Sequence, residues 1–287
     1  MMGKRTASIG LVAAPVVALY LDDWARLIPC WWSDPNYTHG FFVPLFAAYF
    51  VWEKWERLRS EPARASLLGL PLLILGIAVK LWTLFYDSSF VSCASMILVI
   101  SGAVLLVAGR KVFAQVAVPI FFLLLMMPLP TAIYNRLALP LRQFAAIVST
   151  TVLQGFGIPV LREGNVVVLP GRTLEVAEAC SGMRFLTGFI ALGVAFAYLC
   201  RRPLWERIVL LASSVPVAVL ANAVRVTAIS LLAHWGFNSF VDGPPHSATA
   251  LVLFAFSAFI LWAEYYVLCH LFIDEPAATG AGEPKRP

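Results

Sequence analysis

Long apolar runs recur along the 287-residue chain and restrict its fold more than any other feature. Hydrophobic residues make up 60% of the chain, charged residues only 13%, and the mean hydropathy is +0.82. A water-soluble domain could not bury that much apolar surface, so the sequence predicts a polytopic membrane protein. Several runs must extend into flanking polar positions to reach the ~20 residues that a spanning helix needs. The runs cover residues 7–20, 41–52, 66–86, 90–108, 112–127, 183–200, 208–226 and 248–272.

Basic residues cluster in the short segments between these runs. If there are eight spans, every cluster falls on one side of the membrane, and the positive-inside rule makes that side cytoplasmic. The clusters lie at residues 4–5, 54–64, 110–111, 201–207 and 285–286. Both termini are then cytoplasmic. The net charge of +5 is explained as a topology signal, so no nucleic-acid partner is expected.

The opposite, extracytoplasmic face receives residues 22–39, 87–89, 128–179 and 234–247. In the long segment, residues 141–153 place Leu141, Phe144, Ala145, Val148 and Val152 on one helical face. This pattern predicts a helix that lies in the interface or packs against the bundle. Three Val-rich runs follow at residues 159–162, 166–169 and 173–177, separated by E-G-N and P-G-R turns, which predicts a small β-meander.

The expected fold class is therefore all-α, with about eight transmembrane helices, and with the interfacial helix and the β-meander before the sixth of them. Residues 1–274 are expected to form one domain, with an extracytoplasmic insert at about 128–179. Residues 275–287 are expected to be a disordered cytoplasmic tail. The first helix follows Lys4 and Arg5 without an obvious cleavage site, so it is expected to remain uncleaved.

The segment L-E-V-A-E-A-C-S-G-M-R at residues 174–184 carries the first chemical signal. Cys180 lies where a polar, turn-rich segment meets an apolar run, at or near the first turn of a membrane helix. Free N–H groups and the helix dipole favour a thiolate there, and Arg184 adds a positive charge one turn later. The alternative is a packed cysteine that behaves as a small hydrophobe.

The predicted topology brings Cys180, Arg225 and His246 to one depth on three successive helices. A thiolate attacks a peptide carbonyl, a histidine donates a proton to the leaving amine, and a guanidinium stabilises the oxyanion. Arg225 lies on the wrong side for a topology signal, whereas His246 could instead cap its helix after two prolines. His234 is the rival for the proton-transfer role.

Two further residues are candidates for supporting roles. Asn222 lies three residues before Arg225 on the same helix face and could hydrogen-bond across helices or orient a catalytic group. Glu178 could orient Arg184 or His246, or simply face water. The chemistry requires no cofactor and no metal, and the five cysteines form neither a CxxC pair nor a disulfide framework.

The motifs that carry this chemistry resemble those of the exosortase/archaeosortase family of membrane cysteine transpeptidases. The matching pieces are E-A-C-S-G-M-R at 178–184, N-A-V-R-V-T at 222–227 and P-P-H-S-A-T around His246. Supporting pieces are Y-T-H-G-F-F-V-P at 37–44, M-P-L-P at 127–130 and G-I-P-V-L-R-E-G-N at 157–165. The resemblance covers residues 31 to 256, most of the chain.

The resemblance implies a protease or transpeptidase of the bacterial inner membrane that processes exported proteins. These substrates carry a C-terminal sorting signal, namely a short motif (often Pro-Glu-Pro), a hydrophobic helix and a basic tail. It also implies Cys180 as nucleophile, Arg225 as the transition-state or substrate arginine, and His246 as general acid/base. Water or an acceptor amine resolves the acyl-enzyme. His39 matches a family position and either joins the site or anchors the second helix.

Three other classes compete with this interpretation. A transporter or channel would use Lys80 and Arg225 to line a path, but would place charges near the middle of several helices. A factor for exopolysaccharide or lipid-linked glycan assembly would need outer carboxylates, for which Asp34 and Asp242 are the candidates. A metalloprotease is disfavoured because the four histidines are dispersed and no H-E-x-x-H occurs.

Overall fold

The computed structural model describes residues 14–86, 88–176, 182–200, 203–237 and 244–271. It is mostly helical, as the sequence predicts. The α-helices are α2 (Leu21–Ser33), α3 (Phe42–Glu53), α4 (Trp55–Ser60), α5 (Gly69–Trp82), α6 (Ser89–Val107), α7 (Arg110–Phe122), α8 (Thr131–Gly155), α9 (Met183–Leu199), α10 (Leu204–His234) and α12 (Pro244–Leu271). Two 3₁₀ helices, η1 (Pro35–Phe41) and η2 (Leu123–Met126), and strands β1 (Leu161–Glu163), β2 (Val166–Leu169) and β3 (Arg172–Glu175) complete the fold.

Three helices within the described ranges are long and apolar enough to cross a membrane. They are α6, α10 and the stretch Leu251–Leu268 of α12. A fourth crossing is possible if Arg110–Met126 and Thr131–Gly155, which meet at an angle of 80°, form one bent span. α5 and α9 are apolar but shorter. The chain is thus a membrane protein, while the predicted count of eight spans is not confirmed by length and composition.

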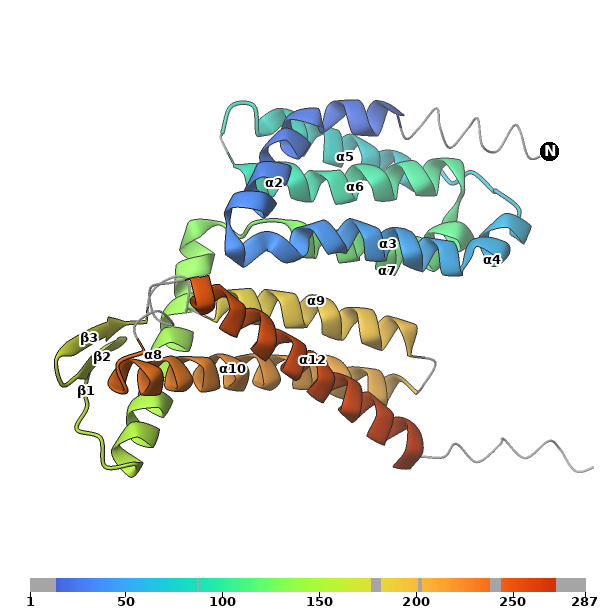
Figure 1. The fold of residues 1–287 in the computed structure, drawn as a ribbon. Coiled ribbons are helices and arrows are strands. Elements are labelled where there is room, and N and C mark those ends of the chain that lie inside the picture. The colour runs from blue at the N-terminus through green and yellow to red at the C-terminus, as the bar shows by residue number, and fades with distance from the viewer. Residues whose placement is uncertain (1–13, 87, 177–181, 201–202, 238–243, 272–287) are drawn as a thin grey trace, which may run out of the picture.

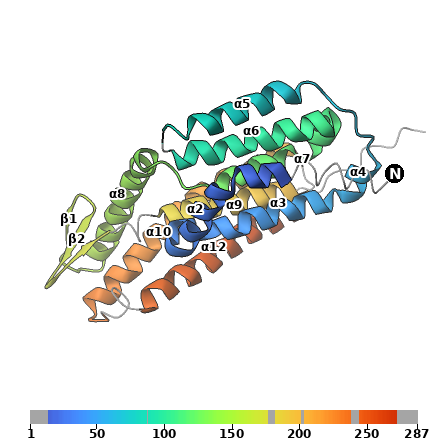
Figure 2. The same ribbon diagram turned by 90° about the horizontal axis from the view of Figure 1, so that it is seen from above.

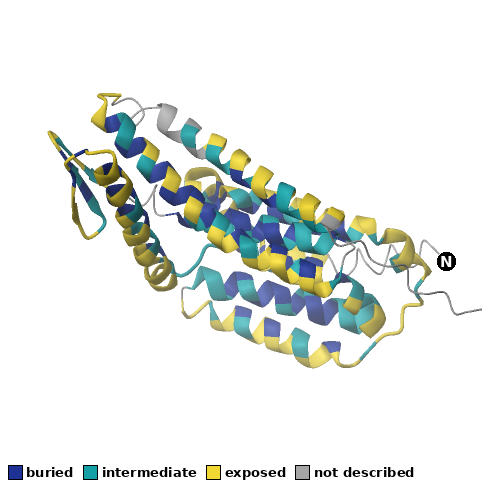
Figure 3. Ribbon diagram, turned by 90° about the horizontal axis from the view of Figure 1, so that it is seen from below, coloured by how far each residue is buried: buried dark blue, intermediate teal, exposed yellow. Residues whose placement is uncertain are grey.

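The long helices lie side by side, and α8 crosses one end of them (Figures 1 and 2). The α5–α6 turn, the beginning of α9, the end of α10 and the three strands lie toward that end, which we call the sheet end. α4 and the α6–α7 turn lie at the opposite end. Buried residues follow the inner faces of the helices, and exposed residues follow their outer faces (Figure 3). That burial pattern fits a bundle with its outer faces toward lipid.

Glycines let α5 and α6 pack closely. A Cβ added at Gly69 would lie 2.4 Å from the Gly102 carbonyl oxygen, and one added at Gly76 would lie 2.7 Å from Val99 Cγ2. Small residues at an interface allow helix backbones to approach, and close packing is a main source of helix association in lipid. The α5–α6 hairpin is therefore one rigid unit of the bundle.

α8 extends the predicted interfacial helix from residues 141–153 to Thr131–Gly155 and packs against α10. The apolar face named from the sequence is not the face that packs, because Phe144 and Val152 are exposed while Ser149 and Thr150 are buried. Ser149 Oγ donates a hydrogen bond of 3.3 Å to Ser230 Oγ of α10. Small residues allow α8 to approach α10, so the bulky apolar side chains are left on the outside.

The predicted β-meander is confirmed. β1, β2 and β3 pair in sequence order, antiparallel, with Val167 opposite Leu174. Gly164 and Gly171 form the two turns with φ of 63° and 78°, a conformation that glycine adopts without strain. Val167 and Leu169 of β2 are buried in a cluster with Leu153 of α8 and Val226 of α10. The sheet is thus attached to the ends of α8 and α10.

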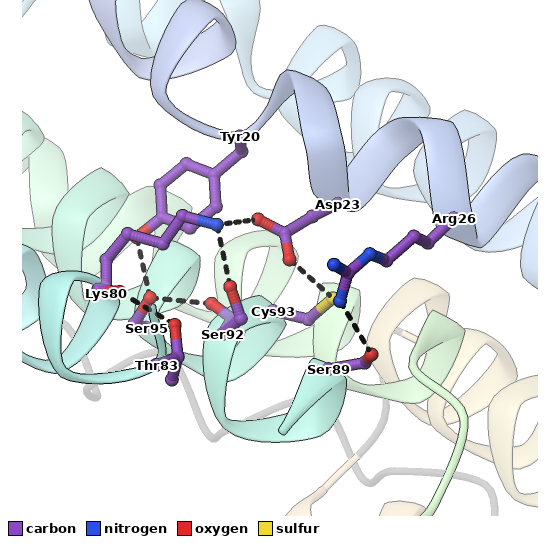
Figure 4. A network of polar contacts seen from close by, with 9 residues as sticks. All are labelled: Tyr20, Asp23, Arg26, Lys80, Thr83, Ser89, Ser92, Cys93 and Ser95. Carbon is purple, nitrogen blue, oxygen red and sulfur yellow. Dashed lines mark hydrogen bonds and ion pairs between the residues drawn. The ribbon is translucent and has the colours of Figure 1, made fainter. Parts of the chain in front are cut away.

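A buried polar network joins α2, α5 and α6 (Figure 4). The Lys80 ammonium pairs with the Asp23 carboxylate and donates a 2.7 Å hydrogen bond to Ser92 Oγ. Ser95 shares a 2.7 Å hydrogen bond with the Tyr20 hydroxyl, and its own hydroxyl donates to the Ser92 carbonyl. An isolated charge in this environment would be costly, so Lys80 and Asp23 each require the other.

We expect Lys80→Met to lower the free energy of unfolding by about 3–5 kcal/mol, because the Asp23 carboxyl group would be left buried without its ion-pair partner. The double variant Asp23→Leu/Lys80→Met should recover most of that loss. Both are measured by denaturant titration of purified protein in mixed micelles. Lys111→Met is the matched control, since Lys111 pairs with Glu61 at 3.2 Å on the surface and its loss should cost about 0–1 kcal/mol. A Lys80→Met cost as small as the control's would contradict the network's role.

Candidate active site

The beginning of α9 is shaped by Gly182. This residue caps the helix with φ 80° and ψ −8°, and its carbonyl accepts the hydrogen bond from Leu186 N at 2.8 Å. A Cβ at Gly182 would lie 2.9 Å from Asn222 Nδ2 and 3.1 Å from Asn222 Cγ. Glycine is needed here both for the left-handed conformation and for the close approach to α10. Gly182 therefore lies directly against Asn222.

Asn222 and Arg225 lie one turn apart on α10, and each is only 2% exposed. The Arg225 guanidinium carbon lies 6.0 Å from the centroid of the Phe185 ring, at the limit of a cation–π contact. Phe185 is the third residue of α9. The two α10 side chains thus meet the first turn of α9, Asn222 at its cap and Arg225 beside its aromatic ring.

The sequence predicted that Arg225 lies at the end of its helix, and this prediction differs from the structure. α10 continues for nine residues, to His234. Val226 and Ala233 in this extension pack with α8 and the sheet, so tertiary contacts keep it helical. Nine residues correspond to about 13 Å along a helix axis, and His234 is exposed. The structure therefore separates His234 from Arg225.

α12 packs against both α9 and α10. Phe254 of α12 packs on α9, with its ring centroid 4.8 Å from that of Phe189 and 6.4 Å from that of Phe185. His246 belongs to the first turn of α12, which begins at Pro244. Its side chain lies outside the described residues, so the meeting of the imidazole with Arg225 stays a prediction.

The sheet supports the chain on the other side of Cys180. Val176 follows β3, and its N–H donates a 3.0 Å hydrogen bond to the Asn165 carbonyl between β1 and β2. The Asn165 amide in turn donates to the Val176 carbonyl at 3.4 Å. Glu178 and Cys180 lie outside the described residues. The described contacts thus fix the residues that flank this segment in the sequence: Val176 is held on the sheet, and Gly182 lies against Asn222.

Arg184 is the second residue of α9 and is half-buried. It lies two residues from Gly182 and therefore belongs to the same turn that approaches Asn222. Its predicted roles, holding a thiolate or reading a substrate carboxylate, stay predictions.

His39 connects two motifs that are distant in the sequence. Its Nε2 donates a hydrogen bond of 3.0 Å to the Leu125 carbonyl, and the Tyr37 hydroxyl accepts a 3.2 Å hydrogen bond from Leu129 N. Trp31 Nε1 likewise donates to the Met126 carbonyl at 2.9 Å. Burial lowers the pKa of His39, although hydrogen bonding to the Leu125 carbonyl acts in the opposite direction. These contacts favour the anchoring role for His39, between the start of the second helix and the segment 123–129.

Gly182 and Phe185 are site residues that the sequence reasoning did not single out. The signal for Gly182 was present, because a glycine directly before an apolar helical run marks a positive φ or a close backbone approach. Phe185 carried no such signal, since an aromatic residue in an apolar span is ordinary. Only the packing of α9 on α10 identifies it as the neighbour of Arg225.

A comparison with protein-family models finds one match, described as transmembrane exosortase, over residues 31–263. Comparisons with curated proteins and with solved structures find no match. The matched region runs from the end of α2 into α12 and contains Gly182, Asn222 and Arg225. Membership supports a role in the processing of sorting signals. The chain belongs to the transmembrane exosortase family.

Proposed function

We propose that this exosortase is a cysteine endopeptidase and transpeptidase that cleaves the C-terminal sorting signals of exported proteins. Cleavage takes place at the extracytoplasmic face of the bacterial inner membrane, through an acyl-enzyme on Cys180. The substrates are exported proteins with a short motif, a hydrophobic helix and a basic tail. Family membership supports the processing of sorting signals in general, and the residues around Gly182 support the cysteine mechanism.

The contact between Gly182 and Asn222 carries this proposal. Cys180 precedes Gly182 by two residues, and two residues of extended chain span at most about 7 Å. Arg225 lies one turn from Asn222 and faces Phe185. A buried, permanently charged guanidinium in reach of a helix N-terminus is a suitable site for a thiolate and for the oxyanion it generates.

The proposed reaction has two steps. The Cys180 thiolate adds to the scissile carbonyl carbon, and Arg225 stabilises the negative charge on the tetrahedral oxygen. The C–N bond then breaks, His246 donates a proton to the leaving amine, and a thioester remains. In the second step His246 takes a proton from water or from an acceptor amine, which attacks the thioester and releases the thiolate.

The neighbouring residues have supporting roles in this proposal. Asn222 holds the chain at Gly182, Arg184 pairs with the thiolate or with a carboxylate of the substrate motif, and Glu178 orients one of the cationic groups. His39 stabilises the packing of the second helix near the site. No metal or cofactor takes part.

The proposal includes an eight-span layout with both termini in the cytoplasm. The described direction of the helices supports it, because the sheet, the α5–α6 turn and the start of α9 share one end while α4 lies at the other. A substrate helix with a basic cytoplasmic tail would lie in the bilayer alongside the helices of the enzyme, with its motif at the sheet end.

We expect Cys180→Ala to abolish processing of a tagged substrate in cells, measured as accumulation of the uncut precursor. Arg225→Lys should slow processing by about 10²–10³-fold, since an ammonium cannot reproduce the planar donor pair of the guanidinium. Cys30→Ala and Arg136→Gln are controls that should leave processing unchanged. Comparable protein levels in membranes separate loss of chemistry from loss of folding. Normal processing by Cys180→Ala would remove Cys180 from the mechanism.

A second prediction concerns Gly182. Gly182→Ala should destabilise the protein more than Gly236→Ala does, because both glycines have φ near 80° but nothing lies within 4 Å of a Cβ at Gly236. Gly236→Ala thus measures the backbone strain alone, about 1–3 kcal/mol. The double variant Gly182→Ala/Asn222→Ala should lose less stability than the sum of the losses in the two single variants, measured by thermal unfolding in detergent. Strict additivity would show that Gly182 does not rest on Asn222.

A third prediction concerns the topology. In a cysteine-free background, Leu161→Cys in β1 should react with a membrane-impermeant maleimide in intact cells, whereas Arg59→Cys in α4 should react only after lysis. Both side chains are exposed, so access decides the result. In a separate experiment on the protein with its native cysteines, Cys93 should react poorly because it is buried, and Cys30 should react slowly because burial raises the pKa of its thiol. Cys200 and Cys269 should be spared. Labelling of Arg59→Cys in intact cells would overturn the layout.

A further inference from the structure

A polar cavity of about 270 Å³ lies at the sheet end of the bundle, between α2 and the α5–α6 turn. Its walls combine two carboxylates with two cations and three hydroxyl groups. The polar residues that line it are Asp22, Asp23, Arg26, Lys80, Thr83, Ser88 and Ser92. The proposed peptidase mechanism uses none of them.

The positive groups of the cavity lie around the beginning of α6. Arg26 Nη1 donates to the Ser89 hydroxyl at 3.4 Å, and Lys80 donates to Ser92 one turn further on (Figure 4). The first-turn N–H groups of α6, a helix of 19 residues, add the positive end of its dipole. Two cations, two serine hydroxyls and a helix N-terminus together favour a phosphate group.

The same cavity also holds negative charge. Asp23 is buried and compensates Lys80 directly. Asp22 is exposed, lines the cavity and lies one turn before Arg26 on α2. The two carboxylates balance the two cations, so the wall has no net charge. A ligand that carries a phosphate and an ammonium group matches this arrangement better than a simple anion does.

The surface next to the cavity is apolar. Leu70, Ile74, Ile77 and Leu81 follow one another at helical spacing along α5, and all are exposed. The row leads to Leu84, which is 70% exposed and lines the cavity. From Leu70 to Leu81 the helix rises about 16 Å. This is close to half of the ~30 Å hydrocarbon core, which is the thickness of one leaflet.

Aromatic residues occur at the end of α5 and just beyond it, next to Leu84 in the sequence. Phe85 lines the cavity and is mostly exposed, and the rings of Trp82 and Tyr86 stack with centroids 4.7 Å apart. Aromatic side chains of this kind gather at the membrane–water interface, where headgroups lie. An aromatic group beside the cavity and an apolar row along α5 are the surroundings that suit a phospholipid headgroup and its acyl chain.

We propose that this cavity binds the headgroup of a zwitterionic phospholipid with a primary amine, while an acyl chain lies along α5. The phosphate sits between Arg26, Ser88 and the N-terminus of α6, and the ammonium group donates hydrogen bonds to Asp22. The lipid joins α2 to the α5–α6 hairpin. This site is independent of the cysteine chemistry, and its test does not use peptidase activity.

The test measures lipid retention by the full-length purified protein in detergent, using native mass spectrometry. Phosphatidylethanolamine, phosphatidylcholine and phosphatidylglycerol with identical chains are added in turn, and soluble phosphoethanolamine is added as a competitor. The parent protein should retain phosphatidylethanolamine at least about tenfold better than the other two, because only its headgroup offers the Asp22 carboxylate a positively charged N–H donor: choline has no N–H, and the glycerol hydroxyls are uncharged. Soluble phosphoethanolamine should not displace it at equal concentration, because it lacks the chains.

Two variants separate the two halves of the headgroup. Asp22→Asn should remove the preference for phosphatidylethanolamine over phosphatidylcholine, and Arg26→Gln should lower the retention of all three lipids about tenfold. Glu56→Gln and Arg59→Gln in α4, exposed charges at the opposite end, are the matched controls and should change nothing. All four side chains are exposed, so unchanged thermal unfolding is expected and is measured alongside.

Three results would overturn the proposal. Retention and preference that are unchanged in both variants would show that the lipid binds elsewhere. A preference for phosphatidylglycerol would show that the charge argument is wrong. Binding of soluble phosphoethanolamine as tight as that of the phospholipid would show that the cavity takes a free headgroup and that the row on α5 plays no part.

Discussion

Buried polar side chains in a membrane bundle have no water to satisfy them, so each one must be placed against another polar group or at a helix terminus. This constraint accounts for where the helices of this protein meet. Asp23 and Lys80 hold α2 against the α5–α6 hairpin. Ser149 and Ser230 join α8 to α10, and Asn222 with Arg225 faces the beginning of α9. Each polar meeting point ties a pair of elements that apolar packing alone would leave free to slide.

The candidate site depends on the third of these meeting points. A helix cap with positive φ needs glycine, and a close approach to a side chain needs glycine again, so Gly182 satisfies both conditions at once. This brings the positive end of the α9 dipole beside a buried guanidinium, two residues after Cys180. The local electrostatics therefore favour negative charge at the place where the proposed nucleophile and its oxyanion would develop it.

Much of the fold could be predicted from the sequence because lipid imposes simple rules on helices and turns. The meander was visible because Gly164 and Gly171 separate short Val-rich runs. The buried face of α8 could not be read from its apolar pattern, since the rule that apolar residues point inward fails where the surroundings are apolar too. There, small residues such as Ser149 and Ala146 mark the inner face, and bulky ones such as Phe144 face outward.

Pairings across long sequence distances could not be predicted. Asp23 and Lys80 are 57 residues apart, and nothing in either neighbourhood specifies the other. A lysine inside an apolar run does require a partner, so the need for a carboxylate was deducible although its identity was not. The position of Arg225 within α10 was missed because the composition of residues 226–233 fits either a segment that follows the end of a span or the continuation of the helix. Contact with α8 and the sheet decides in favour of the helix.

α9 links the two halves of the molecule through two opposite faces. Phe185 and Phe189 lie one turn apart and pack with α10 and α12, whereas Ala191 and Ala195 pack with the N-terminal helices. At 100° per residue, Phe189 and Ala191 differ by about 200° around the helix, so the aromatic and alanine faces are back to back. A helix buried on both faces cannot adjust to one neighbour without moving against the other. The packing of α2, η1 and α3, which His39 joins to the segment 123–129 through its hydrogen bond to Leu125, is thereby coupled to the position of Gly182.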